Sequence, residues 1–103
     1  LGQPQINLVP AGVLETAGAP GGTATIGIRT ENLDIRPAKG AKATARIEWV
    51  EHLGDQNHLH IDIAGHRLVT LARPDDGLSV GDTVRLEPVR PLYFDANGDR
   101  LRA

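Results

Sequence analysis

The sequence contains no cysteine and only one residue each of tryptophan, tyrosine and phenylalanine. Without cysteine the chain forms no disulfide and offers no thiolate as a nucleophile or metal ligand, which suits a reducing compartment. With three aromatic residues it lacks the stacking platform on which single-strand binders hold successive bases. Its net charge of −2 also opposes nucleic-acid binding, which depends on lysine and arginine neutralising phosphates. We therefore expect no nucleic acid among its partners.

Long apolar runs are absent as well. No stretch approaches the ~18 apolar residues of a membrane-spanning helix, and no signal peptide opens the chain, so we expect no direct membrane insertion. Apolar residues still make up 40% of the 103 residues, enough for one small domain with its own core. Because the first residue is Leu1 and not methionine, we expect a piece of a longer product.

Apolar and polar residues alternate through several short segments, which is the pattern of half-buried β-strands. The predicted strands are residues 23–29, 41–53, 58–64, 67–71, 83–87 and 92–94, with residues 6–9 as a further strand or an extended connection. Turn signals such as Asn97-Gly98 separate them. The pattern predicts an all-β fold of six or seven short strands. We favour a small OB-fold-like barrel because closure removes exposed sheet edges.

The segment 41–53 also fits helical spacing, but its turn and its alternating partner segment favour a strand. The apolar phase slips between Trp49 and Val50, and a β-bulge would explain the slip. Trp49 is in phase with Ile47, so we expect it to anchor the core. If it were exposed instead, it would be a natural centre for a partner interface.

Four blocks follow one another along the chain: GIRTENL at 27–33, VEHLGD at 50–55, VGDTVRL at 80–86 and YFDANG at 93–98. In order and spacing they resemble the C-terminal TOBE region (the transport-associated OB fold) of the ATPase subunits of sugar-type ABC importers. Residues 2–7 resemble the segment by which such chains leave the ATPase domain. Thr30 stands where the family pattern usually has proline.

The resemblance implies a domain division and one departure from the family. Residues 1–10 would be the segment leaving an ATPase domain, and residues 11–103 a single TOBE/OB-like β-barrel domain. Between Asn7 and Gly27 the chain has fewer residues than the family commonly carries. A hairpin expected in the shortened region 8–26 is missing, so we expect an abbreviated TOBE architecture.

The resemblance also implies a function. The chain would stabilise and regulate the ATPase dimer of an importer for sugars or related solutes, in the cytoplasm and peripheral to the inner membrane. Its partners would be its own ATPase domain, a second ATPase subunit and, through them, the membrane permease subunits. ATP and Mg would belong to the parent protein. These 103 residues contain no Walker motif, so we expect neither a cofactor nor catalysis here.

Four residues are the candidate interdomain or interface contacts: Arg29, Glu31, Glu51 and His52. Arg29 and Glu31 end a predicted strand, where they would form a local ion pair, cap turn amides or contact the ATPase. Glu51 and His52 precede the turn at Gly54. Glu51 and Asp55 flank this turn, but they would be unsuitable as a catalytic acid and base, because a hairpin tip lacks the pocket that pushes two carboxyl pKa values apart. We expect no catalytic residue.

The sequence offers two other kinds of candidate site. His58, His60 and Asp62 share a strand face, and His52 or His66 would need to approach across a hairpin to complete a zinc site. We expect an ordinary solvated face and no metal. The glycine-rich loop 17–22 lacks the Lys-Ser/Thr pair of a P-loop. Its turn amides still leave a small-oxyanion (molybdate-like) binding module as the alternative function.

Overall fold

The computed structural model describes residues 6–102. Within that range it contains nine β-strands and two short 3-10 turns, so the predicted all-β fold is confirmed. The strands are β1 (Ile6–Pro10), β2 (Thr25–Arg29), β3 (Leu33–Pro37), β4 (Ala45–His52), β5 (Asn57–Ile63), β6 (His66–Ala72), β7 (Thr83–Pro88), β8 (Leu92–Phe94) and β9 (Arg100–Leu101), and the turns are η1 (Thr30–Asn32) and η2 (Gly40–Lys42). The predicted number of six or seven strands is too low, because the irregular β3 and the two-residue β9 also pair with neighbours.

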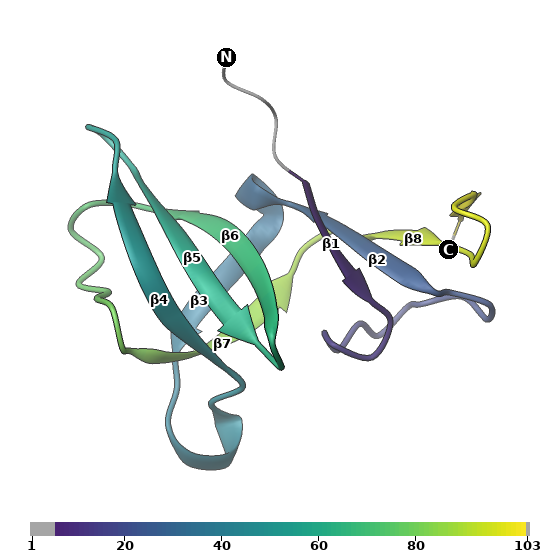
Figure 1. Ribbon diagram of the computed structural model, residues 1–103, viewed down its shortest axis with the longest axis horizontal. Coiled ribbons are helices and arrows are strands. Elements are labelled where there is room, and N and C mark those ends of the chain that lie inside the picture. Colours follow the sequence, from purple (N-terminus) through teal and green to yellow (C-terminus); the bar gives the residue numbers. More distant parts are fainter. Residues whose placement is uncertain (1–5, 103) are drawn as a thin grey trace.

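The strands form two antiparallel sheets that lie side by side (Figure 1). The small sheet has the order β1-β2-β8-β9, and the large sheet has the order β3-β7-β4-β5-β6. The two edge strands of the large sheet approach each other through Thr70 on β6, whose hydroxyl contacts the carbonyl of Leu33 and lies 3.3 Å from the carbonyl of Thr30. The large sheet therefore curls towards closure, which gives the small barrel-like shape expected from the sequence.

The core consists of apolar side chains that alternate with polar ones along the strands and point to the inner faces of the two sheets. Ile26 and Ile28 of the small sheet are buried, and so are the inward residues of the large sheet. Those residues include Ile47, Leu59, Ile61, Ile63, Leu68, Val84 and Leu86. The outer surface of β3 and β7 carries a solvent-exposed pair, in which Arg36 Nε donates to Glu87 Oε1 at 2.6 Å. This hydrogen bond, and then the carboxylate charge, raises the pKa of Arg36 above its ordinary value.

The strand expected at 41–53 is confirmed from Ala45 to His52, but the prediction for Trp49 is wrong. The register of β4 against β5 shifts between Ile47 and Trp49, one position before the expected slip. Glu48 is therefore the extra residue of the bulge, and Trp49 turns to the outer face while Val50 turns inward. Trp49 is 59% exposed, so it does not anchor the core.

Besides the shared apolar core, the buried side chain of Asn7 links the two sheets by hydrogen bonds. Asn7 on β1 donates from Nδ2 to the carbonyls of Ile28 (3.1 Å) and Val69 (2.8 Å), and its Oδ1 accepts from the Val69 amide at 2.8 Å. Because β6 is an edge strand, the Asn7 amide occupies the backbone groups that a further strand would otherwise pair with. Residues 6–10 are thus hydrogen-bonded to both sheets. Whether the first ten residues also lead from another domain stays a prediction, and residues 1–5 lie outside the described range.

The connection between β1 and β2, residues 11–24, contains no strand. Leu14 from this loop is only 4% exposed and belongs to the core cluster. Beside it, Glu15 Oε1 lies 3.2 Å from Arg85 Nη2 on β7. The shortened loop therefore folds back over the large sheet, and its leucine supplies apolar packing without the hairpin expected from the family pattern.

Candidate functional site

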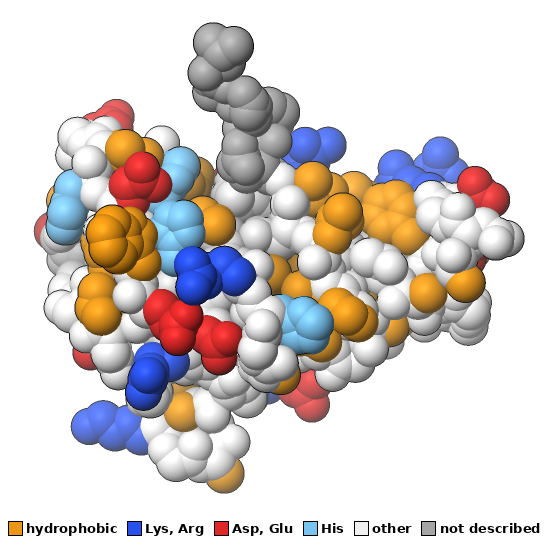
Figure 2. Space-filling model, viewed as in Figure 1, with side chains coloured by type: hydrophobic (Ala, Val, Ile, Leu, Met, Phe, Trp, Pro, Cys, Tyr) orange, Lys and Arg blue, Asp and Glu red, His pale blue; other side chains and the backbone are white. Residues whose placement is uncertain are grey.

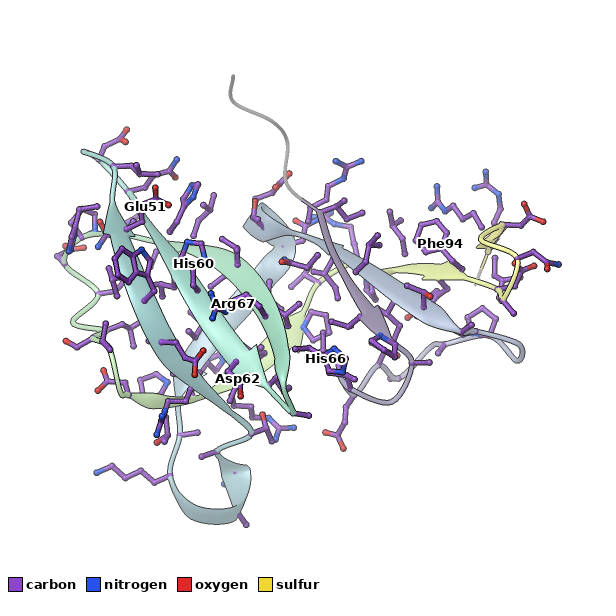
Figure 3. All side chains as sticks on the ribbon, in the orientation of Figure 1. Glu51, His60, Asp62, His66, Arg67 and Phe94 are labelled. Atoms are coloured by element: carbon purple, nitrogen blue, oxygen red, sulfur yellow. The ribbon has the colours of Figure 1, made fainter. Side chains whose placement is uncertain are left out.

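The outer surface of β4 and β5 brings an aromatic side chain next to two imidazoles and a carboxylate. Cross-strand register places Trp49 opposite His60 and Glu51 opposite His58. We call these four residues the histidine face. In Figure 3 Glu51 and His60 stand on the same side of the large sheet, and Figure 2 shows histidine, acidic and basic side chains around hydrophobic ones in this region.

One carboxylate oxygen lies close to both imidazoles of the histidine face. Glu51 Oε1 lies 3.5 Å from His60 Nε2 and 3.8 Å from His58 Nδ1. These contacts become ion pairs when the imidazoles are protonated. All three side chains are partly solvated, so each pair is worth little to folding. The arrangement places polar side chains next to the exposed indole.

The histidine face has the composition of a protein contact surface. The exposed Trp49 can bury a large area at low entropic cost, and Val69 and Leu71 on β6 are half-buried. Alternation along β6 puts both of these residues on the same outer side, because Leu68 and Thr70 are buried. Across the sheet, His58 and His60 of β5 lie between Trp49 and these two half-buried residues. An exposed tryptophan with polar and apolar neighbours on one sheet face is typical of a protein interface.

The other sequence candidates do not pair with one another in the described range. His52 ends β4 on the opposite side from Glu51, and its Nδ1 is 3.2 Å from Oδ1 of Asn57. Arg29 is the exposed last residue of β2, and Glu31 lies in η1. These last two form no ion pair with each other, and the only neighbour that binds the Glu31 carboxylate within the described range is the Thr30 hydroxyl, at 3.3 Å. The local ion pair suggested by the sequence is therefore not formed.

The candidate residues for metal and anion binding have surroundings that do not form such sites within the described range. Asp62 lies between Arg46 and Arg67 in the sheet register. Within residues 6–102, no group of three or more histidine, aspartate or glutamate side chains is placed to hold a metal ion. In the glycine-rich loop the Thr23 amide and hydroxyl both bond to the Pro20 carbonyl, at 3.3 and 2.7 Å. That loop is closed on itself as a turn and gives the oxyanion alternative no support.

Alternation alone did not predict two features of the surface. The exposure of Trp49 depends on which residue is extra in the bulge, and a phase slip locates that residue only to within a position or two. A groove bordered by Arg29, Arg90, Arg100 and Arg102 brings together residues that are far apart in the sequence. Arg29, at the end of β2, was already a candidate from the sequence. No local sequence pattern connects it with the other three arginines of the groove.

Comparison with known proteins identifies the family of this domain. The family model of the TOBE domain matches residues 26–90, from β2 to the bend after β7. The chain is 29% identical, over an alignment of 109 residues, to the sn-glycerol-3-phosphate import ATP-binding protein UgpC 3 of Rhizobium johnstonii. The alignment covers 92% of this chain and 31% of that relative, so the chain spans about a third of the relative's length. Residues 6–102 include no helix of the length and apolarity needed to cross a membrane.

Proposed function

The chain belongs to the TOBE domain family, and from this premise we propose that it is the C-terminal regulatory and dimer-stabilising domain of an ABC importer ATPase. The observation that carries the proposal is the family match, together with an alignment that covers nearly the whole chain but only a third of an import ATP-binding protein. The remaining two thirds of such a protein have room for the nucleotide-binding domain. The 103 residues themselves hold no Walker motif.

The geometry supports a role in docking rather than in chemistry. Glu51 and the two imidazoles lie on an open strand face and not in a pocket that shields them from water. Trp49 is the largest exposed side chain of that face. We infer that the histidine face contacts the ATPase domain or the second ATPase subunit, with the indole buried at the centre and Glu51 at the rim.

The two-sheet arrangement suits a domain that acts as one body. Asn7 ties β1 to β6, so a displacement of β1 moves the large sheet with it. We propose that β1 conveys the position of the preceding ATPase domain to the histidine face in this way. The parent protein would bind ATP and Mg, lie in the cytoplasm at the inner membrane, and reach the permease subunits through its ATPase domain. Its solute would be a sugar or a related compound.

A substitution in the histidine face tests the proposal in the full polypeptide that contains this chain. Trp49→Ala should weaken ATPase dimerisation in sedimentation velocity by about 30-fold, the effect of losing an interface anchor worth ~2 kcal/mol. The control is Val80→Ala, because Val80 is as exposed as Trp49 (60% against 59%) but lies in the turn before β7. An unchanged dimer with Trp49→Ala, or an equal loss with Val80→Ala, would remove the histidine face from the dimer interface.

A further inference from the structure

The small sheet carries a second surface whose charge is of one sign. A groove of ≈ 590 Å³ is bordered by Arg29 of β2, Arg90 of the bend before β8, and Arg100 and Arg102 at the end of the chain. We call it the arginine groove. It contains four of the chain's nine arginines and is lined by no acidic residue, although the chain as a whole has a net charge of −2. The positive charge is therefore concentrated locally.

These four guanidinium groups have no carboxylate partner in the described part of the chain. The arginines that do form ion pairs between residues 6 and 102 are Arg36, Arg67 and Arg85, which lie on the large sheet. Arg90 also has a φ of +52°, a left-handed conformation that is uncommon for a residue with a side chain. Four like charges around one groove repel one another, and a ligand that brings negative charge would relieve the repulsion.

An apolar cluster adjoins the groove on the same outer face. Ile6 and Leu8 are 40% and 59% exposed, and with Phe94 their side chains meet over Gly27, where an added Cβ would lie 3.1–3.2 Å from all three. We call Ile6, Leu8 and Phe94 the apolar cluster. Register places Arg29 directly opposite Ile6, and the partner of Phe94 on β9 is an arginine of the groove. In Figure 2 basic side chains line the margin of the small sheet beside hydrophobic ones, and Figure 3 places Phe94 on this face.

We propose that the arginine groove and the apolar cluster form one docking surface for an acidic segment of a protein partner, which presents carboxylates beside apolar side chains. Guanidinium groups pair with carboxylates through two parallel hydrogen bonds, which fixes the orientation of the segment. The apolar cluster supplies the burial that exposed charge pairs cannot supply alone. A small free anion would meet only solvated arginines and would bind weakly.

The same charges exclude a second copy of this chain as the occupant in a two-fold contact. Such a contact places a surface against itself, so the four arginines of one copy would face those of the other. Like charges brought together across an interface repel one another, which disfavours the pairing. The surface also lies on a different sheet from the histidine face, so it does not rest on the proposed function.

Peptide titration of the 103-residue chain, followed by amide chemical shifts, tests the proposal. The probe is a seven-residue peptide that alternates glutamate with valine and leucine, and the control peptide carries glutamine in place of glutamate. The glutamate peptide should shift the amides of residues 25–29, 92–94 and 100–102, and the glutamine peptide should bind about tenfold more weakly. No binding, equal binding of both peptides, or shifts centred on the histidine face would overturn the proposal.

Matched arginine variants distinguish binding at the arginine groove from a general effect of net charge. Arg100→Gln with Arg102→Gln should weaken binding of the glutamate peptide about tenfold, whereas Arg46→Gln with Arg73→Gln removes the same charge elsewhere and should leave it unchanged. An equal loss in both pairs would show that only net charge matters and would refute the docking surface.

The apolar part of the surface is tested in the same way. Leu8→Ser should weaken the peptide several-fold, and Val80→Ser should not, although the two side chains are equally exposed (59% and 60%). Both are on the surface, so thermal unfolding should show that each variant remains folded. Tighter binding of oligo-dT, of phosphatidylserine vesicles or of inorganic phosphate than of the glutamate peptide would replace the acidic protein segment with a general anion and overturn the proposal.

Discussion

Removing the side-chain amide of Asn7 should destabilise the domain, because this buried side chain links the small sheet to the large one. The amide makes three hydrogen bonds, to the Ile28 carbonyl and to both backbone groups of Val69. Each is worth about 1 kcal/mol net, and truncation to alanine leaves the partners in a partly buried seam between the sheets. We therefore expect Asn7→Ala to cost about 3 kcal/mol of unfolding free energy.

That loss is a large share of the total, because a domain of this size has a stability of roughly 5–15 kcal/mol. It corresponds to a fall in Tm of about 10–20 °C. Urea unfolding followed by circular dichroism measures the loss, and amide hydrogen exchange locates it. The Val69 amide should lose protection selectively, since its acceptor is Oδ1 of Asn7 at 2.8 Å.

Two further substitutions serve as comparisons for Asn7→Ala. Asn7→Asp retains the acceptor for Val69 but cannot donate to either carbonyl, so it should be at least as destabilising as alanine at neutral pH. Asn97→Ala, in the exposed turn before β9, should change stability by less than ~0.5 kcal/mol. If Asn7→Ala cost under ~1 kcal/mol, or if Val69 kept its protection, the two sheets would not be coupled through this residue.

Three other expectations follow from the packing. Thr70→Val keeps the volume but removes the hydroxyl that bridges β6 to the start of β3, so urea unfolding should show a loss of about 1–2 kcal/mol; a neutral result would show that the barrel closes without it. Leu14→Ala should cost about 2–4 kcal/mol in the same assay, because this loop side chain is only 4% exposed, whereas a surface leucine would cost almost nothing. The fluorescence of Trp49, the only tryptophan, should be quenched by iodide almost as readily in the folded chain as in urea; a protected, blue-shifted indole would contradict the bulge at Glu48.

The strand pattern was predictable because each strand faces the core on one side and water on the other. Leu59, Ile61 and Ile63 alternate with His58 and His60 along β5, and the same rule placed Val84 and Leu86 inward on β7. The turn before β7 was also readable: Gly81 has a φ of +93°, a conformation that glycine adopts without steric cost. The residues within each of these segments determine its structure, so the sequence of the segment was enough to predict it.

The sequence predicted a buried Trp49 because a bulge reverses which side of the strand each later residue faces, and the position of the bulge was one residue off. A slip placed between Trp49 and Val50 puts the indole inside, and a slip one position earlier, at Glu48, puts it outside. Both placements satisfy the same apolar pattern, and only the pairing with β5 decides between them. The candidate surface around Glu51 therefore gained its most important residue only from the structure.

The arginine groove and the role of Asn7 depend on contacts between distant parts of the chain. Asn7 and Val69 are 62 positions apart, and Arg29 meets arginines that follow β7 and β8. A single sequence gives the composition of such a cluster but not its assembly, because the assembly is set by sheet order. The pairing of β2 with β8 brings the groove together.

Measurement of ATP hydrolysis by the full polypeptide that carries this chain, alongside the 103-residue chain alone, tests the central claim most directly. The account predicts that the full polypeptide hydrolyses MgATP, and that the chain alone neither hydrolyses it nor gains thermal stability from it. A full polypeptide without ATPase activity, or a rise in the Tm of the isolated chain with MgATP, would contradict the assignment of this domain to an ABC importer ATPase.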